Sequence, residues 1–290
     1  MRMVREANVR DLKEWVQPLL ALCRVAGEAI CEHYYHPDAG DYKAKHDDSP
    51  LTRADLAAHH TLVSGLASLD ASLAVLSEES TPAEILQRRD WRRFWLIDPL
   101  DGTREFLERT GEFTINIALI DDHKPVLGIL YLPLERIAYV GIPGVQALRY
   151  VDAGDGSWLV SDLATRALDT TGKLTVLASR RHRGPRFKAC LAWLEEEWGS
   201  RISRSNMGSA LKFSRMAEGH GDLYPRFSPC CEWDTAAGQA VLEAAGGQLL
   251  GLDGKPLRYN LSDSLLSPPF YAIADGKQAL WSRLLEVNFT

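Results

Sequence analysis

Short apolar runs bounded by turn residues fill residues 73–142 of this chain and constrain its fold more than any other feature. Val, Ile, Leu and Tyr dominate these runs, a composition typical of strands. Two segments with apolar residues at helical spacing, 12–34 and 56–69, precede them. The polar stretch 38–50 is typical of a loop or a loose hairpin. The expected strands span residues 73–77, 94–98, 113–120, 125–132 and 137–142.

The second half of the chain mixes strands and helices, which indicates an α+β or layered α/β fold. A Gly- and Asp-rich stretch at residues 144–156 favours a division there. We therefore expect an N-terminal α+β sub-domain over residues 1–145 and a C-terminal α/β sub-domain over residues 146–290. Further strands are expected at 174–179 and 271–275, and helices at 187–198, 208–218, 233–245 and up to residue 286.

Composition and charge exclude several classes of protein. Apolar residues make up 46% and charged residues 25% of the 290 residues, which excludes a disordered chain. The net charge of −6 argues against a nucleic-acid polymer as partner, because such binding needs a basic surface. Residues 1–14 lack the apolar core of a signal peptide, and the longest apolar stretch, 126–134, is about half a membrane span. Five cysteines without a CxxC pair predict reduced thiols in the cytoplasm.

Two carboxylates stand three residues apart where an apolar strand ends, in the segment DPLDGT (98–103). The turn lets Asp98 and Asp101 point into one small volume, which is costly unless a cation lies between them. Oxygen ligands of this kind suit Mg²⁺. The backbone N–H groups of Gly102 and Thr103 can bind a phosphate at the start of a short helix. The alternative is a capped turn in which Asp101 is only a helix N-cap.

Two more acidic residues occupy comparable places in the chain. Glu78 directly follows the expected strand 73–77, and Asp234 opens a helix of small residues. Taken singly, Glu78 is a solvated loop carboxylate and Asp234 an N-cap. Their function depends on whether they form one site with Asp98 and Asp101.

Several segments, in order, resemble the signatures of the inositol monophosphatase superfamily of Mg²⁺-dependent, lithium-sensitive phosphatases. The resemblance is closer to one branch, the 3'(2'),5'-bisphosphate nucleotidases of the CysQ type. It covers most of the chain, from about residue 45 to residue 247. The segments are DDSPLTRAD (47–55), EE (78–79), DPLDGT (98–103), GSALKF (208–213), LYPRF (223–227) and WD (233–234).

This resemblance implies a layered αβαβα sandwich of two sub-domains with metal ions between them. It implies that one Mg²⁺ is bound by Glu78, Asp98 and the Leu100 carbonyl. A second Mg²⁺ would be bound by Asp98, Asp101 and Asp234, so that Asp98 bridges the two. The resemblance leaves room for a third, weakly held Mg²⁺ near Glu78.

The resemblance also implies the catalytic residues Asp55, Thr103 and Glu78. Thr103, hydrogen-bonded to Asp55, would orient and deprotonate a water that attacks the phosphomonoester directly, without a phosphoenzyme. Asp55 has a second interpretation as a helix cap, and the two roles are compatible.

Basic residues are candidates for a second phosphate on the substrate. Lys212 and Arg226 are the main ones, although Lys212 is equally well explained as part of a solvated helix face. Lys45 is a weaker candidate. The full substrate-binding set consists of Leu100, Asp101, Gly102, Thr103, Lys212, Arg226 and Asp234.

The chain departs from the branch pattern just before Trp233. Cys230 and Cys231 stand where the branch usually has Thr and an apolar residue. Two packed thiols are the simpler interpretation, and oxidation or soft-metal binding beside Asp234 is the other.

The expected function is Mg²⁺-dependent hydrolysis of the 3'-phosphate of 3'-phosphoadenosine 5'-phosphate to AMP and phosphate, linked to sulfate assimilation. The alternatives are an inositol monophosphatase or a sugar bisphosphatase on the same fold, and, more remotely, a non-catalytic ligand-sensing protein. The expected partner is a small phosphorylated nucleotide. The expected location is the cytoplasm, with peripheral association with the inner membrane and the oligomeric state left open.

Overall fold

A seven-stranded sheet forms the first part of the computed structural model, which describes residues 9–36, 40–45, 50–181 and 184–289. Its strands are neighbours in the order in which they follow along the chain. The first two are parallel and every later pair is antiparallel. The strands are β3 (Ala74–Ser77), β4 (Arg93–Asp101), β5 (Thr114–Asp121), β6 (Lys124–Leu132), β7 (Ile137–Ile142), β8 (Gln146–Asp152) and β9 (Trp158–Asp162).

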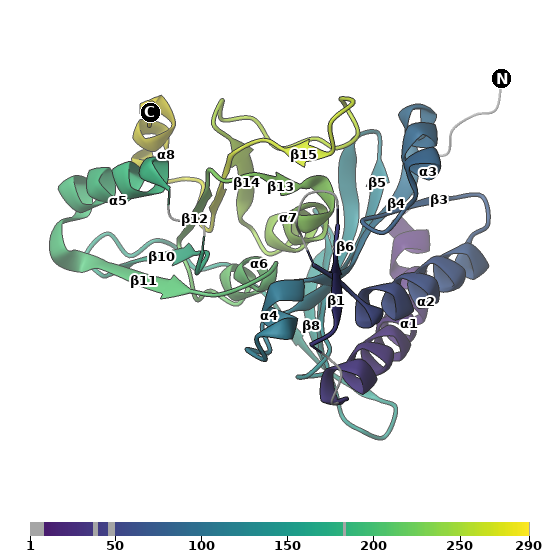
Figure 1. Ribbon diagram of the computed structural model, residues 1–290. Helices are drawn as coiled ribbons and strands as arrows, with labels where there is room; N and C mark the ends of the chain where they lie inside the picture. The colour runs from purple at the N-terminus through teal and green to yellow at the C-terminus, as the bar shows by residue number, and fades with distance from the viewer. Residues whose placement is uncertain (1–8, 37–39, 46–49, 182–183, 290) are drawn as a thin grey trace.

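Helices α1 (Val9–Tyr35) and α2 (Arg53–Leu69) cover one face of this sheet (Figure 1). Leu19 of α1 and Leu62 of α2 are fully buried, in one apolar cluster with Ile117 of the sheet. The helical spacing of their apolar residues therefore has the expected cause, one buried face on each helix.

Helices α6 (Leu211–Ala217) and α7 (Ala236–Ala244) lie on the opposite face. α7 packs unusually near the strands because Gly128 and Gly141 have no side chains. A Cβ at Gly128 would lie 2.4 Å from the carbonyl oxygen of Ala237, and one at Gly141 would lie 2.4 Å from the Cα of Val241. Any larger residue at either glycine would push α7 away from the sheet.

A five-stranded sheet lies on the other side of α6 and α7. Helices α5 (Pro185–Trp198) and α8 (Ala279–Glu286) pack on its outer face (Figure 1). The chain thus forms helix, sheet, helix, sheet and helix layers, and the expected αβαβα sandwich is confirmed. In spatial order the strands are β11 (Ile202–Asn206), β10 (Leu174–Ala178), β12 (Leu223–Arg226), β16 (Phe270–Ile273) and β14 (Gln248–Gly251).

Short elements complete the fold. The hairpin expected within residues 38–50 is present, since β1 (Tyr42–Ala44) pairs antiparallel with β2 (Pro50–Thr52). A second two-stranded pair joins β13 (Cys230–Cys231) to β15 (Leu266–Ser267). The remaining helical segments are α3 (Pro82–Gln87), η1 (Arg88–Asp90), α4 (Thr103–Leu107), η2 (Gly199–Arg201) and η3 (Glu232–Asp234).

The division expected between residues 145 and 146 does not coincide with the division between the two sheets. It falls between β7 and β8, which are neighbours in the seven-stranded sheet, and that sheet continues to Asp162. Gly144 and the glycines at 154 and 156 form the turns of β-hairpins rather than a linker. Among the described residues, no helix has both the length and the apolar character needed to cross a membrane.

Candidate active site

A bulge in β4 brings Asp98 and Asp101 to the same side of the sheet. Asp98 pairs with Asn116 and Asp101 with Thr114, so three steps along β4 match two along β5. Without this extra residue, side chains an odd number of positions apart would point to opposite faces. Carboxylate oxygens of Asp98, Asp101 and Asp234 all lie within 4.8 Å of one another. Three of the four acidic residues expected to bind metal are therefore brought together.

Backbone and amide N–H groups orient these three carboxylates. Asp98 accepts the Leu100 N–H at 3.0 Å, and Asp101 accepts the Ala210 N–H at 2.6 Å. Asp234 accepts the Cys231 N–H at 3.1 Å. Each of these hydrogen bonds uses one carboxylate oxygen, so the second oxygen of each residue remains available to a ligand between the three side chains.

Desolvation and mutual repulsion make this cluster unfavourable for bare anions. They raise the pKa of Asp98 well above its ordinary value, with Glu78, Asp101 and Asp234 all contributing after burial. Desolvation and the charge of Asp101 raise the pKa of Asp234 to about 8. An all-oxygen donor set of this kind is the one that hard divalent cations such as Mg²⁺ prefer. These residues fit a Mg²⁺ site.

Glu78 follows β3, the strand beside β4, and its negative charge contributes to the raised pKa of Asp98. Its carboxylate also accepts a 2.6 Å hydrogen bond from Lys45 Nζ, as does that of Glu79. Burial opposes the charge of Lys45, but the two carboxylates raise its pKa above the ordinary value. Lys45 is therefore engaged with Glu78 and Glu79, and its expected role at a second phosphate is not supported by this geometry.

Asp55 and Thr103 are hydrogen-bonded as expected. The Thr103 hydroxyl lies 3.1 Å from Asp55 Oδ1 and 3.3 Å from the Leu100 carbonyl oxygen. Asp55 Oδ2 accepts the Thr52 N–H at 2.7 Å and the Thr52 hydroxyl, which completes a capping box at the start of α2. The helix-cap position and the contact with Thr103 thus coexist in one carboxylate. Of the segment DDSPLTRAD, residues 47–49 lie outside the described part of the chain.

Gly102 joins β4 to α4 in a left-handed conformation, with a φ of 97° that only glycine adopts readily. A Cβ there would also lie 2.9 Å from the Glu112 carbonyl oxygen. Gly102 is therefore required to turn Thr103 back towards Asp55.

Lys212 is buried near the carboxylates, not on a solvated helix face. Its Nζ donates hydrogen bonds to the carbonyl oxygens of Met207, Gly208 and Ser209, at 3.3, 3.1 and 2.6 Å. It lies 5.1 Å from the centre of the Tyr224 ring, and burial lowers its pKa to about 8.

Arg226 occupies the same part of the site as Lys212. Its guanidinium donates to the Tyr224 hydroxyl at 3.2 Å and to the Pro229 carbonyl at 3.1 Å. Arg226 and Lys212 line a cavity of about 400 Å³ that also contains Asp101 and Asp234. The cavity is therefore lined by both acidic and basic side chains.

Arg181 also lines this cavity and was not identified from the sequence. It forms ion pairs with Glu105, at 3.3 Å, and with Glu108. No motif covers it, and the run of basic residues around it (SRRHR, 179–183) was the only available signal.

Cys230 and Cys231 belong to a strand, so their side chains point to opposite sides. All five cysteines are free, as expected. Desolvation raises the pKa of the Cys230 thiol to about 12, so it is an unreactive packed thiol. The simpler interpretation of this pair therefore agrees with the structure.

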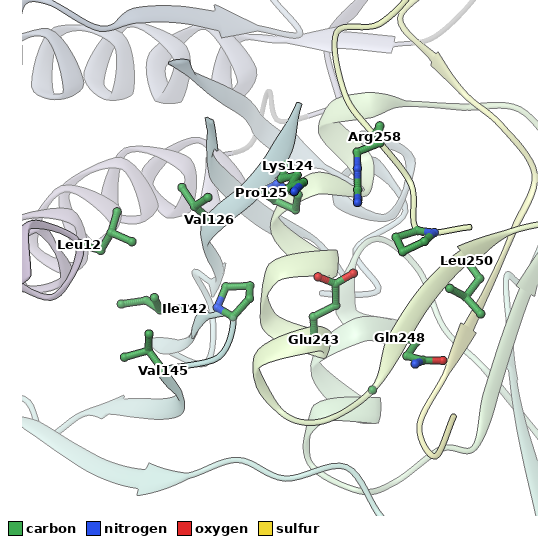
Figure 2. A pocket seen from close by; sticks show the side chains of 13 residues that line it. Leu12, Lys124, Pro125, Val126, Ile142, Val145, Glu243, Gln248, Leu250 and Arg258 are labelled. Atoms are coloured by element: carbon green, nitrogen blue, oxygen red, sulfur yellow. The ribbon is translucent and has the colours of Figure 1, made fainter. Parts of the chain in front are cut away.

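A second cavity of about 530 Å³ lies beyond the C-terminal end of α7, on the far side from Asp234 (Figure 2). Figure 2 shows Glu243 in its centre, between an apolar wall that includes Val126 and Ile142 and another that includes Leu250. No residue of the expected site lines this cavity. The carboxylate cluster, and not the larger hollow, defines the candidate active site.

The fold and the acidic site define a class of phosphatase-like proteins, and the comparison with known families agrees. The chain belongs to the inositol monophosphatase family, which it matches over residues 11–282.

Within this family, the chain is similar to proteins named 3'(2'),5'-bisphosphate nucleotidase CysQ. The chain is 42% identical to the one from Escherichia coli (strain K12) over 253 residues, which are 86% of this chain and 95% of that protein. It is 40% identical to the one from Salmonella typhimurium over 88% of this chain and 98% of that protein. The solved structure of CysQ from Bacteroides thetaiotaomicron has a TM-score of 0.79 at 35% identity, covering 93% of this chain and all of that one.

Proposed function

We propose that this protein is a Mg²⁺-dependent phosphatase that removes the 3'-phosphate of 3'-phosphoadenosine 5'-phosphate, yielding AMP and phosphate. In this role it would clear a by-product of sulfate assimilation. The observation that carries the proposal is the convergence of Asp98, Asp101 and Asp234. Two of these residues, Asp101 and Asp234, line a cavity together with Lys212 and Arg226.

The metal assignment is the one that the family resemblance implies, and the clustering of Asp98, Asp101 and Asp234 supports part of it. One ion would be held by Glu78, Asp98 and the Leu100 carbonyl, and a second by Asp98, Asp101 and Asp234. A third Mg²⁺ would be bound more weakly near Glu78. Bound Mg²⁺ would neutralise charge on the phosphate and lower the pKa of the attacking water.

Asp55 and Thr103 would move the proton of that water. The Thr103 hydroxyl already donates to Asp55, so its oxygen lone pairs are free to accept a hydrogen bond from water. As Thr103 takes a proton from the water it passes its own to Asp55. Burial raises the pKa of Asp55, which makes this carboxylate a better proton acceptor than an exposed one.

The basic side chains that line the cavity would bind the second phosphate of the substrate. Lys212 and Arg226 place two positive charges there, and their charges act on each other enough to lower the pKa of Lys212 further. An anion between them would relieve this repulsion. A substrate with one phosphate has no group to do so, and the relatives named as bisphosphate nucleotidases support a nucleotide over a sugar bisphosphate.

The decisive experiment is phosphate release from 3'-phosphoadenosine 5'-phosphate and, in parallel, from inositol 1-phosphate. Each substrate would be tested with Mg²⁺, with Mg²⁺ and EDTA, and with Mg²⁺ and LiCl. We expect Mg²⁺-dependent, lithium-inhibited release with a strong preference for the nucleotide. A preference for inositol 1-phosphate would keep the metal site and overturn the nucleotidase assignment.

We also propose that the enzyme works in the cytoplasm with a small nucleotide as its partner. Five free cysteines, two of them adjacent in β13, fit a reducing compartment. Separation of a cell lysate into soluble, periplasmic and membrane fractions tests this location.

A further inference from the structure

Asp234 must be held against two carboxylates that come from another part of the chain. Asp98 and Asp101 belong to β4, whereas Asp234 is the last residue of η3. The geometry of the second metal site therefore depends on whatever fixes η3 relative to β4.

Arg88, in the turn η1 just before β4, provides one side of this connection. Its side chain is buried, with 2% exposed. Nη1 donates a hydrogen bond to the Asn260 side-chain oxygen, and Nη2 donates to the carbonyl oxygens of Ser262 and Asp263 at 2.9 and 2.7 Å. Asn260 Nδ2 donates back to the Arg88 carbonyl at 2.8 Å. Arg88 and the segment 260–263 are thus locked together from both directions.

Asn260 provides the other side. Its backbone N–H lies 3.1 and 2.9 Å from the two carboxylate oxygens of Glu232, the first residue of η3. The Glu232 N–H donates to the Leu265 carbonyl at 2.8 Å, so residues 260–265 hold Glu232 by both its side chain and its backbone. Asn260 has a φ of 58°, a left-handed conformation that Asn tolerates better than most residues. A continuous chain of contacts therefore runs from Arg88 through Asn260 to the segment that ends in Asp234.

A charged side chain buried at position 88 carries a desolvation cost that lowers the free energy of unfolding. In the part of the chain that the structure describes, Arg88 has no carboxylate within ion-pair distance, and its partners are neutral oxygens. A well-packed apolar side chain would avoid the desolvation of a buried cation. The several directional contacts of the guanidinium, rather than its contribution to stability, are what an apolar residue could not supply.

We propose that Arg88, Asn260 and Glu232 are positioning residues that hold Asp234 at the distance from Asp98 and Asp101 that the second metal ion requires. The inference rests on the proposed metal-dependent function and extends it to residues that touch neither metal nor substrate. Loss of groups that orient metal ligands typically weakens metal binding by about 10–100-fold.

The test measures metal binding directly, by counting free Mn²⁺ with electron paramagnetic resonance as Mn²⁺ is added to the full chain. The main variant is Arg88→Met, which keeps much of the volume and removes every donor. Arg88→Lys keeps the charge with fewer contacts and serves if the first variant does not fold. The control is Arg166→Met, which breaks the ion pair of a partly exposed arginine with buried Asp222, at the opposite end of β10 from the site.

We expect both Arg→Met variants to lower the melting temperature, because each leaves polar oxygens without their hydrogen-bond donor, and this cost exceeds the gain from no longer burying a guanidinium. Only Arg88→Met, and to a smaller extent Arg88→Lys, should weaken the lower-affinity Mn²⁺ site, by about tenfold. Phosphate release by Arg88→Met should then recover at high Mg²⁺. The substitution should raise the Mg²⁺ concentration needed for the half-maximal rate more than it lowers kcat. The inference is overturned if Arg88→Met and Arg88→Lys bind Mn²⁺ within twofold of the unmodified protein. If the unmodified protein itself binds no Mn²⁺, or binds it without hydrolysing the nucleotide, the proposed function fails instead.

Discussion

The Thr103 hydroxyl donates a 3.1 Å hydrogen bond to Asp55, and the same carboxylate closes the capping box that starts α2. One side chain therefore links the first turn of α2 to the turn that follows the bulged strand β4. The orientation of Thr103 depends on an element that is fixed by the apolar core, so the hydroxyl is held in place before any substrate arrives.

Asp55→Asn should separate the two functions of this carboxylate. The amide still accepts a hydrogen bond from Thr52, so we expect the melting temperature to fall only slightly. It is a far weaker base, so kcat should fall by about 10²–10⁴-fold. Thr103→Ser, which keeps the hydroxyl, is the matched control and should retain most of the activity of the unmodified protein. Steady-state phosphate release checks both, and an Asp55→Asn enzyme of normal kcat would exclude the proton transfer.

Asp98→Asn should abolish turnover while leaving the fold intact. The substitution removes the carboxylate that both metal ions would share, and we expect a loss of about 10³-fold or more. It also removes a buried negative charge beside Glu78, Asp101 and Asp234, so the metal-free variant should melt no lower than the unmodified protein. Calorimetry in EDTA and phosphate release in Mg²⁺ measure the two effects. Retention of a tenth of the activity would contradict the assignment of Asp98.

Lys212→Met should discriminate between substrates with and without a second phosphate. We expect KM for 3'-phosphoadenosine 5'-phosphate to rise by about tenfold or more, because a buried positive charge that would attract the second phosphate is lost. KM for adenosine 3'-monophosphate, which lacks the 5'-phosphate, should change much less. Lys188→Met, on the exposed side of α5, is the control. Equal effects on both substrates would mean that Lys212 acts only by holding the carbonyls of residues 207–209.

Metal stabilisation should increase with pH. The pKa of Asp234 is raised to about 8, so the metal-free folded state binds more protons than the unfolded chain above about pH 4. This contribution to stability is present at low pH and is lost as the pH rises towards 8. Mg²⁺ competes with those protons and gains affinity over the same range. Melting temperatures in Mg²⁺ and in EDTA between pH 5.5 and 8.5 check this, and a difference that is constant or shrinks with pH would contradict it.

Most of the site could be predicted because its residues lie in short contiguous motifs. Asp98, Asp101, Gly102 and Thr103 occupy six positions of sequence, and the resemblance connected them with Glu78 and Asp234. The strands of the first sheet could be predicted from apolar runs that are buried on both faces, such as β5 and β7, whereas the five-layer arrangement was implied by the resemblance. These signals come from residues that are close together in the chain, so they can be found in the sequence.

Other features had no local signal. β9 has only three apolar residues, 158–160, and is mostly exposed at the edge of its sheet. The Gly- and Asp-rich turns at residues 144–156 were therefore interpreted as a division, which placed the expected boundary at residue 145. The contact of Arg88 with Asn260 joins residues 172 positions apart in two segments without a motif. The pairing of Lys45 with Glu78 likewise depends on how a hairpin folds over the sheet. Such contacts are decided by tertiary packing and not by neighbours in sequence.

The close packing of α7 on Gly128 and Gly141 affects the order in which this protein folds during synthesis. When the seven-stranded sheet is complete at Asp162, the face that α7 will cover is still bare, because residues 236–244 have not been synthesised. That face carries Leu96, Ala118, Leu130 and Tyr139, all part of the core shared with α6 and α7. The growing chain therefore exposes a broad apolar surface until its last quarter emerges, and Asp234 completes the acidic cluster in the same step that buries that surface.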